Sequence, residues 1–113
     1  MEKFLLLIRE DLARLEQMTE AEMQADIEEM TRWVEELSQA GNYLQGEPLM
    51  SYGRYVTAET ILTDGPFIET KEAISGYLMI TAGGLDQATS IAQSCPHIIK
   101  GTVSIEVRPV MQI

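Results

Sequence analysis

One short stretch of the sequence gathers acidic, basic and aromatic side chains around a predicted turn. It reads Asp64-Gly65-Pro66-Phe67-Ile68-Glu69-Thr70-Lys71. A carboxylate at a turn that follows a strand can act as a general base or hold a polar ligand, which makes Asp64 the first catalytic candidate. The same carboxylate can instead accept the backbone amides of its own turn, as turn aspartates commonly do. The stretch is therefore a candidate site, with a purely structural turn as the alternative.

The residues around Asp64 complete a predicted ligand cleft. In an extended segment Glu69 and Lys71 share one face, so they either pair on the surface or line the cleft as charged contacts. An ion pair between them would keep the carboxylate charged, which suits binding better than proton donation. The predicted ligand-binding set, with Phe67 and Tyr77 as apolar walls, is Gly65, Pro66, Phe67, Glu69, Lys71 and Tyr77.

His97 is the only histidine of the chain and the second catalytic candidate. Its imidazole is the one side chain that titrates near neutral pH without perturbation. Because His97 follows Pro96 at a predicted helix end, a capping or loop role is the alternative. Cys95 falls on an apolar helical face, which favours a small buried hydrophobic residue over a nucleophile.

Motifs for metals and cofactors are missing from the sequence. One histidine and one cysteine do not make a ligand set with zinc spacing, so we expect no metal site. The sequence contains no P-loop, dinucleotide-binding, nucleophile-elbow, CxxC or HExxH pattern, so we expect no cofactor.

Strands and helices must position these residues. Apolar or alternating runs predict strands at residues 4–8, 55–57, 60–62, 77–81 and 102–108, and turns at 46–48 and 51–53. The first helix begins at a capping box of Thr19 and Glu22 and ends at Gly41. Its predicted apolar face consists of Met23, Ile27, Met30, Val34 and Leu37. A second helix covers residues 88–95 and stops at Pro96.

The order strand, helix, two or more strands, helix, strand is the split βαβ pattern of ferredoxin-like α+β domains. The 113 residues form a single predicted domain spanning 1–113. Two helices would cover one face of its antiparallel sheet. The other face receives either Leu5 and Leu7 or the set Phe4, Leu6 and Ile8, and both sets are apolar. A second copy packed sheet to sheet would cover that face, so we predict a homodimer; a loop folded over the face is the alternative.

The string DGPFxExKE at residues 64–72, followed after three residues by Gly76-Tyr77, resembles the YCII-related family in its DGPF-containing branch. The turn at 46–49 and the closing strand near Pro109 are similar to the same family. The resemblance implies a ferredoxin-like α+β sandwich that dimerises through its sheets as a dimeric α+β barrel.

The resemblance says less about function. Most relatives of this branch are uncharacterised; some are encoded with, or fused to, extracytoplasmic-function sigma factors, and a few members of the wider family act on small organic molecules. The wider family has a proposed active-site pair, a histidine on the first helix and an aspartate near its end. The first helix of this sequence contains no histidine, so that pair does not carry over.

Charge restricts the partners. Eight Lys and Arg against eighteen Asp and Glu give a formal charge of −10, which disfavours nucleic acid and anionic membranes. No signal peptide or membrane span is apparent and the single cysteine cannot form an intrachain disulfide, so we expect a cytoplasmic protein.

Two functions remain open at this point. The first is a homodimer with a small-molecule cleft, with or without enzymatic activity, near the Asp64 loop. The second is a non-catalytic regulatory or interaction protein linked to sigma-factor systems, with the acidic first helix as its docking surface.

Overall fold

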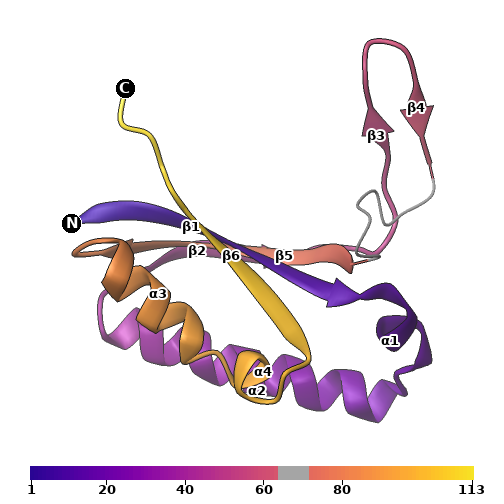
Figure 1. Cartoon of the computed structure of the whole chain (residues 1–113). Helices are drawn as coiled ribbons and strands as arrows, with labels where there is room; N and C mark the ends of the chain where they lie inside the picture. Colours follow the sequence, from indigo (N-terminus) through magenta and orange to yellow (C-terminus); the bar gives the residue numbers. More distant parts are fainter. Residues whose placement is uncertain (64–71) are drawn as a thin grey trace.

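The computed structural model describes residues 1–63 and 72–113. In chain order the elements are β1 (Glu2–Asp11), α1 (Leu12–Gln17), α2 (Glu20–Gln39), β2 (Tyr43–Pro48), β3 (Tyr55–Val56), β4 (Ile61–Leu62), β5 (Glu72–Ala82), α3 (Leu85–Gln93), α4 (Pro96–Ile99) and β6 (Val103–Pro109). The main sheet has the order β2-β5-β1-β6 with every pair antiparallel, and the helices lie on one side of it (Figure 1). This is the predicted ferredoxin-like α+β fold.

The central strands determine which residues meet the helices. Along β1 the side chains alternate, so that Phe4, Leu6 and Ile8 are buried while Leu5 and Leu7 are half-buried on the opposite face. β5 repeats this alternation, with Leu78 and Ile80 buried and Tyr77 and Met79 half-buried. The sequence left open which apolar set faces away from the helices, and the structure assigns Leu5 and Leu7 to that open face.

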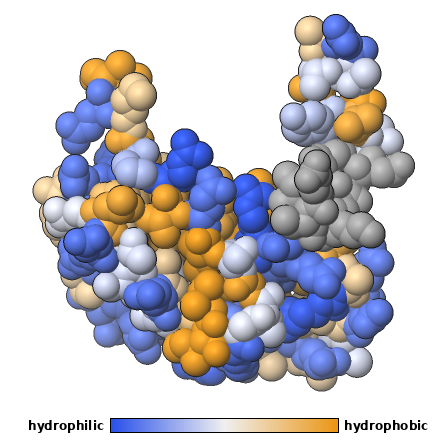
Figure 2. Space-filling model, viewed as in Figure 1, coloured by the Kyte–Doolittle hydropathy of each residue, from blue (hydrophilic) through white to orange (hydrophobic). Residues whose placement is uncertain are grey.

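Two projections rise on the open side of the sheet (Figure 1). One is the hairpin of β3 and β4, which forms its own two-stranded sheet, and the other is the chain end after Pro109. Figure 2 shows both standing away from the body. Large hydrophobic side chains are exposed on them, including Val56 and Ile61 on the hairpin and Met111 at the chain end.

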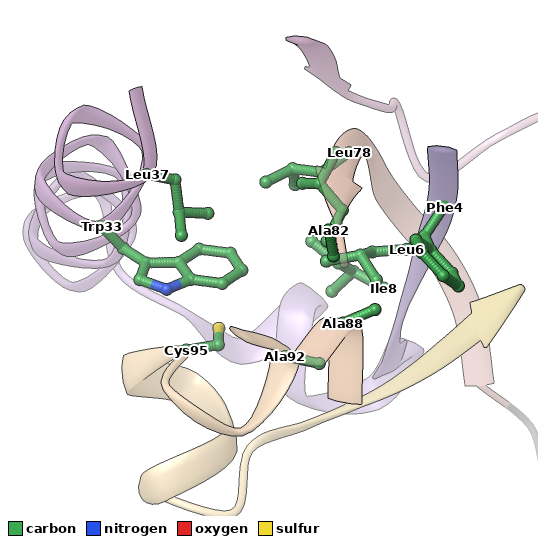
Figure 3. Packing of buried hydrophobic residues seen from close by; sticks show 11 residues of the cluster. Phe4, Leu6, Ile8, Trp33, Leu37, Leu78, Ala82, Ala88, Ala92 and Cys95 are labelled. Atoms are coloured by element: carbon green, nitrogen blue, oxygen red, sulfur yellow. The ribbon is translucent and has the colours of Figure 1, made fainter. Parts of the chain in front are cut away.

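The core lies between the sheet and the helices (Figure 3). Leu6 and Ile80 from the sheet are fully buried, as is Cys95, the residue just before α4. Trp33 of α2 is buried as well, and its indole Nε1 donates a hydrogen bond to Ser94 Oγ at 2.9 Å. That bond satisfies the one polar group of the indole, so the ring can pack as an apolar wall.

Helix α2 begins and ends as its sequence predicts. Thr19 and Glu22 exchange both hydrogen bonds of a capping box, and Gly41 adopts a positive φ of 82° just beyond the helix. The prediction of its apolar face is partly wrong. Trp33 and Leu37 are the buried residues of α2. Met23 and Ile27 are exposed, and the amino-terminal half of the helix carries no buried side chain.

Two local predictions are wrong: the turn at 46–48 and the end of a helix at Pro96. Residues 46–48 belong to β2, where a Cβ on Gly46 would lie 2.7 Å from the Tyr77 carbonyl oxygen; the glycine permits close strand pairing and does not mark a turn. The strands predicted at 55–57 and 60–62 are confirmed as β3 and β4, which form a two-stranded sheet separate from the main one. Pro96 does not simply end a helix: α3 ends at Gln93, and Pro96 opens the separate helix α4.

No helix among residues 1–63 and 72–113 combines the length and apolar character that crossing a bilayer requires.

Candidate functional site

The candidate site lies on the open face of the sheet, over the second half of β1. In the strand register Leu7 lies between Tyr77 of β5 and Glu106 of β6, and all three side chains are half-buried. Directly opposed residues share a face, so an apolar side chain is flanked by a phenol on one side and a carboxylate on the other.

A bulge shapes the end of this face. The register of β1 against β5 shifts between Ile8 and Arg9, which places Arg9 opposite Ile74. On its other side Arg9 opposes Ser104 of β6. Bulges bend a strand and redirect its side chains, so the sheet changes here from an apolar centre to a polar end.

Glu106 organises the polar end through both of its carboxylate oxygens. Oε1 accepts a hydrogen bond from Arg9 Nη2 at 3.2 Å, and Oε2 accepts one from Arg108 Nη1 at 3.1 Å. The hydrogen bond from Arg108, followed by that from Arg9, lowers the pKa of Glu106 below its ordinary value. Glu106 therefore stays ionised at neutral pH and is suited to holding Arg9 in place, not to donating a proton.

A shallow groove of about 370 Å³ crosses the end of β1 beside this ion pair. Arg9, Asp11, Glu72 and Ser104 contribute its polar lining. Ser104 Oγ donates a hydrogen bond to Glu72 Oε2 at 2.9 Å, which joins β6 to β5 across the central strand. Glu72 follows Lys71 directly in the chain, so the groove is adjacent to the end of the DGPF-containing segment.

The groove supplies binding groups of both charges. The guanidinium of Arg9 offers donors for a carboxylate or an oxyanion, and Glu72 and Asp11 offer acceptors for hydroxyl groups. Leu7 precedes Arg9 by two residues on the same face of β1 and lies opposite Tyr77. Ser104 is bonded to a carboxylate and not to an imidazole, so its hydroxyl lacks the usual activating base.

Most of the predicted ligand loop lies outside the described residues. This applies to Asp64, Gly65, Pro66, Phe67, Glu69 and Lys71. Tyr77 is described: it is half-buried on the open face, opposite Leu7, and its role as a wall of a ligand cleft stays a prediction.

The structure places His97 away from Tyr77, on the helix side of the sheet. Its side chain is buried in α4, and Nε2 lies 3.7 Å from Oδ1 of Asp26 on α2. The sequence predictions treat His97 as a catalytic candidate or a capping residue, but give it no partner. The described geometry makes it a buried residue between two helices.

Cys95 behaves as the small buried hydrophobic residue that its position predicts. It has no exposed surface, and its thiol contacts Met30 Sδ at 3.7 Å. Burial raises the pKa of this thiol, so it stays protonated at neutral pH. A Cys95–His97 nucleophile pair is therefore not supported.

The comparison with known families covers almost the whole chain. Residues 3–113 match the YCII-related domain. The chain belongs to the YCII-related family. This confirms the resemblance that its sequence motifs carry, whereas membership of the DGPF-containing branch stays a prediction.

Two individual proteins are similar to this YCII-related chain. A stretch of 56 residues is 43% identical to an uncharacterized protein of Rhizobium meliloti (strain 1021), covering 50% of this chain and 45% of that protein. The chain thus spans less than half the length of this curated relative. The fold is also similar to a solved structure, that of 5-chloro-2-hydroxyhydroquinone dehydrochlorinase from Burkholderia phenoliruptrix in complex with 2,5-dihydroxybenzoquinone. The two chains align with a TM-score of 0.62 at 15% sequence identity. The alignment covers 98% of this chain and 95% of that chain. At that identity the likeness establishes a shared fold alone.

Sequence reasoning on this YCII-related chain missed two features. Arg9 was overlooked, although the alternation Leu5, Leu7, Arg9 along β1 already assigns it to the open face. The contact between Asp26 and His97 had no signal in the sequence, because the two residues come from helices far apart in the chain. Because α2 contains no histidine, the proposed active-site pair of the wider family does not carry over to it.

Proposed function

We propose that this YCII-related protein is a homodimer that binds a small organic molecule in a cleft on the open face of the sheet, beside the DGPF-containing segment. One observation carries the proposal. The apolar centre of the open face, formed by Leu5, Leu7, Tyr77 and Met79, is covered by none of the helices among residues 1–63 and 72–113, whereas the same strands are covered on the other face. A sheet with two apolar faces needs a second layer, and a second copy supplies it.

The two projections favour a dimer over a single chain whose open face is exposed to solvent. The hairpin and the chain end rise on the open side, and both expose large hydrophobic side chains such as Ile61 and Met111 (Figures 1 and 2). An isolated two-stranded hairpin has little stability in water. Packing against a second copy would bury these side chains together with the face between them.

The groove at the end of β1 defines the ligand class. It combines the Arg9 guanidinium with carboxylates and lies next to Leu7 and Tyr77. That combination fits a small molecule with an apolar or aromatic body and an acidic or hydroxyl substituent. We propose binding without naming a reaction, because Glu106 is held ionised by two arginines and the Cys95 thiol is buried.

A first probe follows from the shared fold. The dehydrochlorinase of Burkholderia phenoliruptrix is solved with 2,5-dihydroxybenzoquinone, a small planar molecule with polar substituents. The analogy is one of fold only, so this compound serves as a starting point within a panel of small aromatic and aliphatic acids. The single buried cysteine agrees with a cytoplasmic location, which we retain as part of the proposal.

The test is a thermal-shift screen of that panel against the full chain and three variants. A ligand at 100 times its Kd raises the free energy of unfolding by about 2.7 kcal/mol, which gives a clear shift in Tm. We expect a shift that is lost in Arg9→Met and Asp64→Ala and kept in Arg32→Met, a matched loss of charge on the helix side. A panel with no effect, or a shift that survives Arg9→Met, would contradict the proposed cleft.

A further inference from the structure

A second group of chemically active side chains lies on the helix side of the sheet, between α2 and α4. Asp26 and Glu29 come from α2 and His97 from α4, and one ligand atom of each lies within 4.8 Å of the others. Asp26 and Glu29 are three residues apart on a helix, so they project from the same face toward α4. This group is distinct from the groove on the open face, and the inference below does not depend on the proposed function.

The imidazole of His97 lacks a partner in this group. The residue is 4% exposed, and its Nε2 is buried without a hydrogen bond to any of the described residues. Oδ1 of Asp26 is 3.7 Å from this nitrogen, which is beyond hydrogen-bond distance. A buried polar atom without a partner is destabilising, so an occupant between Nε2 and the carboxylates would be stabilising.

The spacing fits a metal ion better than a direct bond. Two ligands of a tetrahedral zinc ion with bonds of about 2.0 Å lie about 3.3 Å apart. The separation of 3.7 Å between Nε2 and Oδ1 is close to that value. Glu29 has only to rotate its side chain to complete a set of one nitrogen and two oxygen ligands. We propose that Asp26, Glu29 and His97 bind one divalent transition-metal ion, with Zn²⁺ as the representative ion.

The ligand chemistry favours this class of cation over Mg²⁺ and Ca²⁺. Imidazole suits zinc and its transition-metal neighbours, whereas Mg²⁺ and Ca²⁺ select oxygen ligands only. One further coordination position is left for water, as three protein ligands leave a tetrahedral ion incomplete. The sequence-based expectation of no metal site rested on spacing along the chain and did not consider residues that the fold brings together.

Neighbouring cations determine how strongly the ion binds. Asp26 accepts a hydrogen bond from Arg14 Nη2 at 3.3 Å through Oδ2, which leaves Oδ1 toward His97. Arg14 can therefore keep its contact and orient the carboxylate while Oδ1 binds the metal. Lys100 forms an ion pair with Glu29, and this half-exposed lysine competes directly with a metal ion for that carboxylate.

An approach from solvent is present at Glu29. A shallow groove of about 220 Å³ between α2 and the start of α4 is lined by Glu29, Glu36 and Pro96 among others. A hydrated cation can reach Glu29 there before it loses water to Asp26 and His97. Once bound, the ion would link α4 to α2, and its effect would appear as increased stability.

The experiment is isothermal titration of Zn²⁺ into the full chain after treatment with a chelator, followed by thermal unfolding with and without Zn²⁺. We expect one ion per chain, a higher Tm when it is bound and no binding of Mg²⁺. His97→Gln and Asp26→Asn should each weaken Zn²⁺ binding at least about 100-fold, since even outer-shell changes cost 10- to 100-fold. Lys100→Met should strengthen binding about two- to fivefold, because it removes the competing cation.

The matched control is on the same helix. Glu29→Gln should weaken binding, while Glu28→Gln, which removes an exposed carboxylate one position away, should leave it unchanged. Circular dichroism establishes that each variant is folded before its titration is interpreted. Absence of Zn²⁺ binding to the native chain, or binding that persists in both His97→Gln and Asp26→Asn, overturns the proposal.

Discussion

The two faces of the central sheet are made from alternate residues of the same strands, yet they differ in how they are completed. On the helix side Leu6 and Ile80 have no exposed surface, because they belong to one core cluster with buried residues of α2 and α3. On the open side their neighbours Leu7 and Met79 are half-buried, and none of the helices in the described part of the chain lies over them. An uninterrupted apolar strand thus indicates cover on both faces, and the described helices of this chain supply that cover on one face.

The largest expected effect is on the free energy of unfolding, measured at Leu6 and Leu7, which are neighbours in β1 on opposite faces of the sheet. Leu6→Ala leaves a cavity in the closed core and should lower the free energy of unfolding by about 2–5 kcal/mol, independent of protein concentration. Leu7→Ala should cost less stability at low protein concentration, and its cost should grow as the concentration rises, because Leu7 lies in the proposed dimer interface. Urea unfolding at two concentrations measures both. Equal, concentration-independent losses would remove the distinction between the faces.

A charge on the open face should separate the subunits without unfolding them. Leu7→Glu places a carboxylate in the proposed interface, and an unpaired charge buried at an interface costs about 2–5 kcal/mol, or at least about 30-fold in the dimer Kd. Sedimentation velocity reports the change. The matched control is Ile27→Glu, the same substitution at an exposed position of α2, which should leave the dimer intact. Dissociation by Ile27→Glu alone would place the interface on the helix side.

The capping box should contribute a smaller and purely local amount. Thr19→Ala removes the acceptor for the Glu22 amide, which lies 3.1 Å from the Thr19 hydroxyl, and should lower the free energy of unfolding by about 1 kcal/mol. The dimer Kd should be unchanged, since the box lies on the helix side of the sheet. A change in Kd comparable to that of Leu7→Glu would show that the two sides are coupled.

The smallest expected effect is on the acid dependence of stability. The folded pKa of Glu106 is lowered, so its contribution is fully present above the unfolded pKa of about 4.3 and is lost as the pH falls through the lower folded value. Between about pH 5 and about pH 3, the native chain should therefore lose slightly more stability than Glu106→Gln. The control Glu28→Gln should follow the native curve. An identical acid profile in all three would show that the arginine contacts of Glu106 have no net effect.

The sequence predicted most reliably where a local rule decides the structure. The capping box of Thr19 and Glu22, the positive φ at Gly41 and the alternation along residues 103–107 depend on neighbouring residues, and the structure agrees with each. The predictions failed where tertiary contacts decide. Gly46 has the composition of a turn, but the approach of β5 makes it a strand residue. Pro96 is a different case, because the local preference of proline for the first position of a helix places it at the start of α4 and not at the end of α3.

The two candidate sites differ in the same way, since one follows from a local pattern in the sequence and the other from tertiary contacts. The open face and its groove could be anticipated from the period of β1, including Arg9, because alternation is a local property. The group of Asp26, Glu29 and His97 could not, since the packing of α4 against α2 brings together residues that no spacing rule connects. The residues of the DGPF motif from Asp64 to Lys71 lie outside the described part of the chain, so their assigned roles stay predictions.

The central claim is that the open face is completed by a second copy of the chain. Sedimentation velocity of the native chain at micromolar concentration tests it most directly. The account predicts a single species with twice the chain mass of 12.7 kDa, which dissociates on dilution. A species with the mass of one chain across the micromolar range would contradict it, and with it the cleft that the proposed function places at this face.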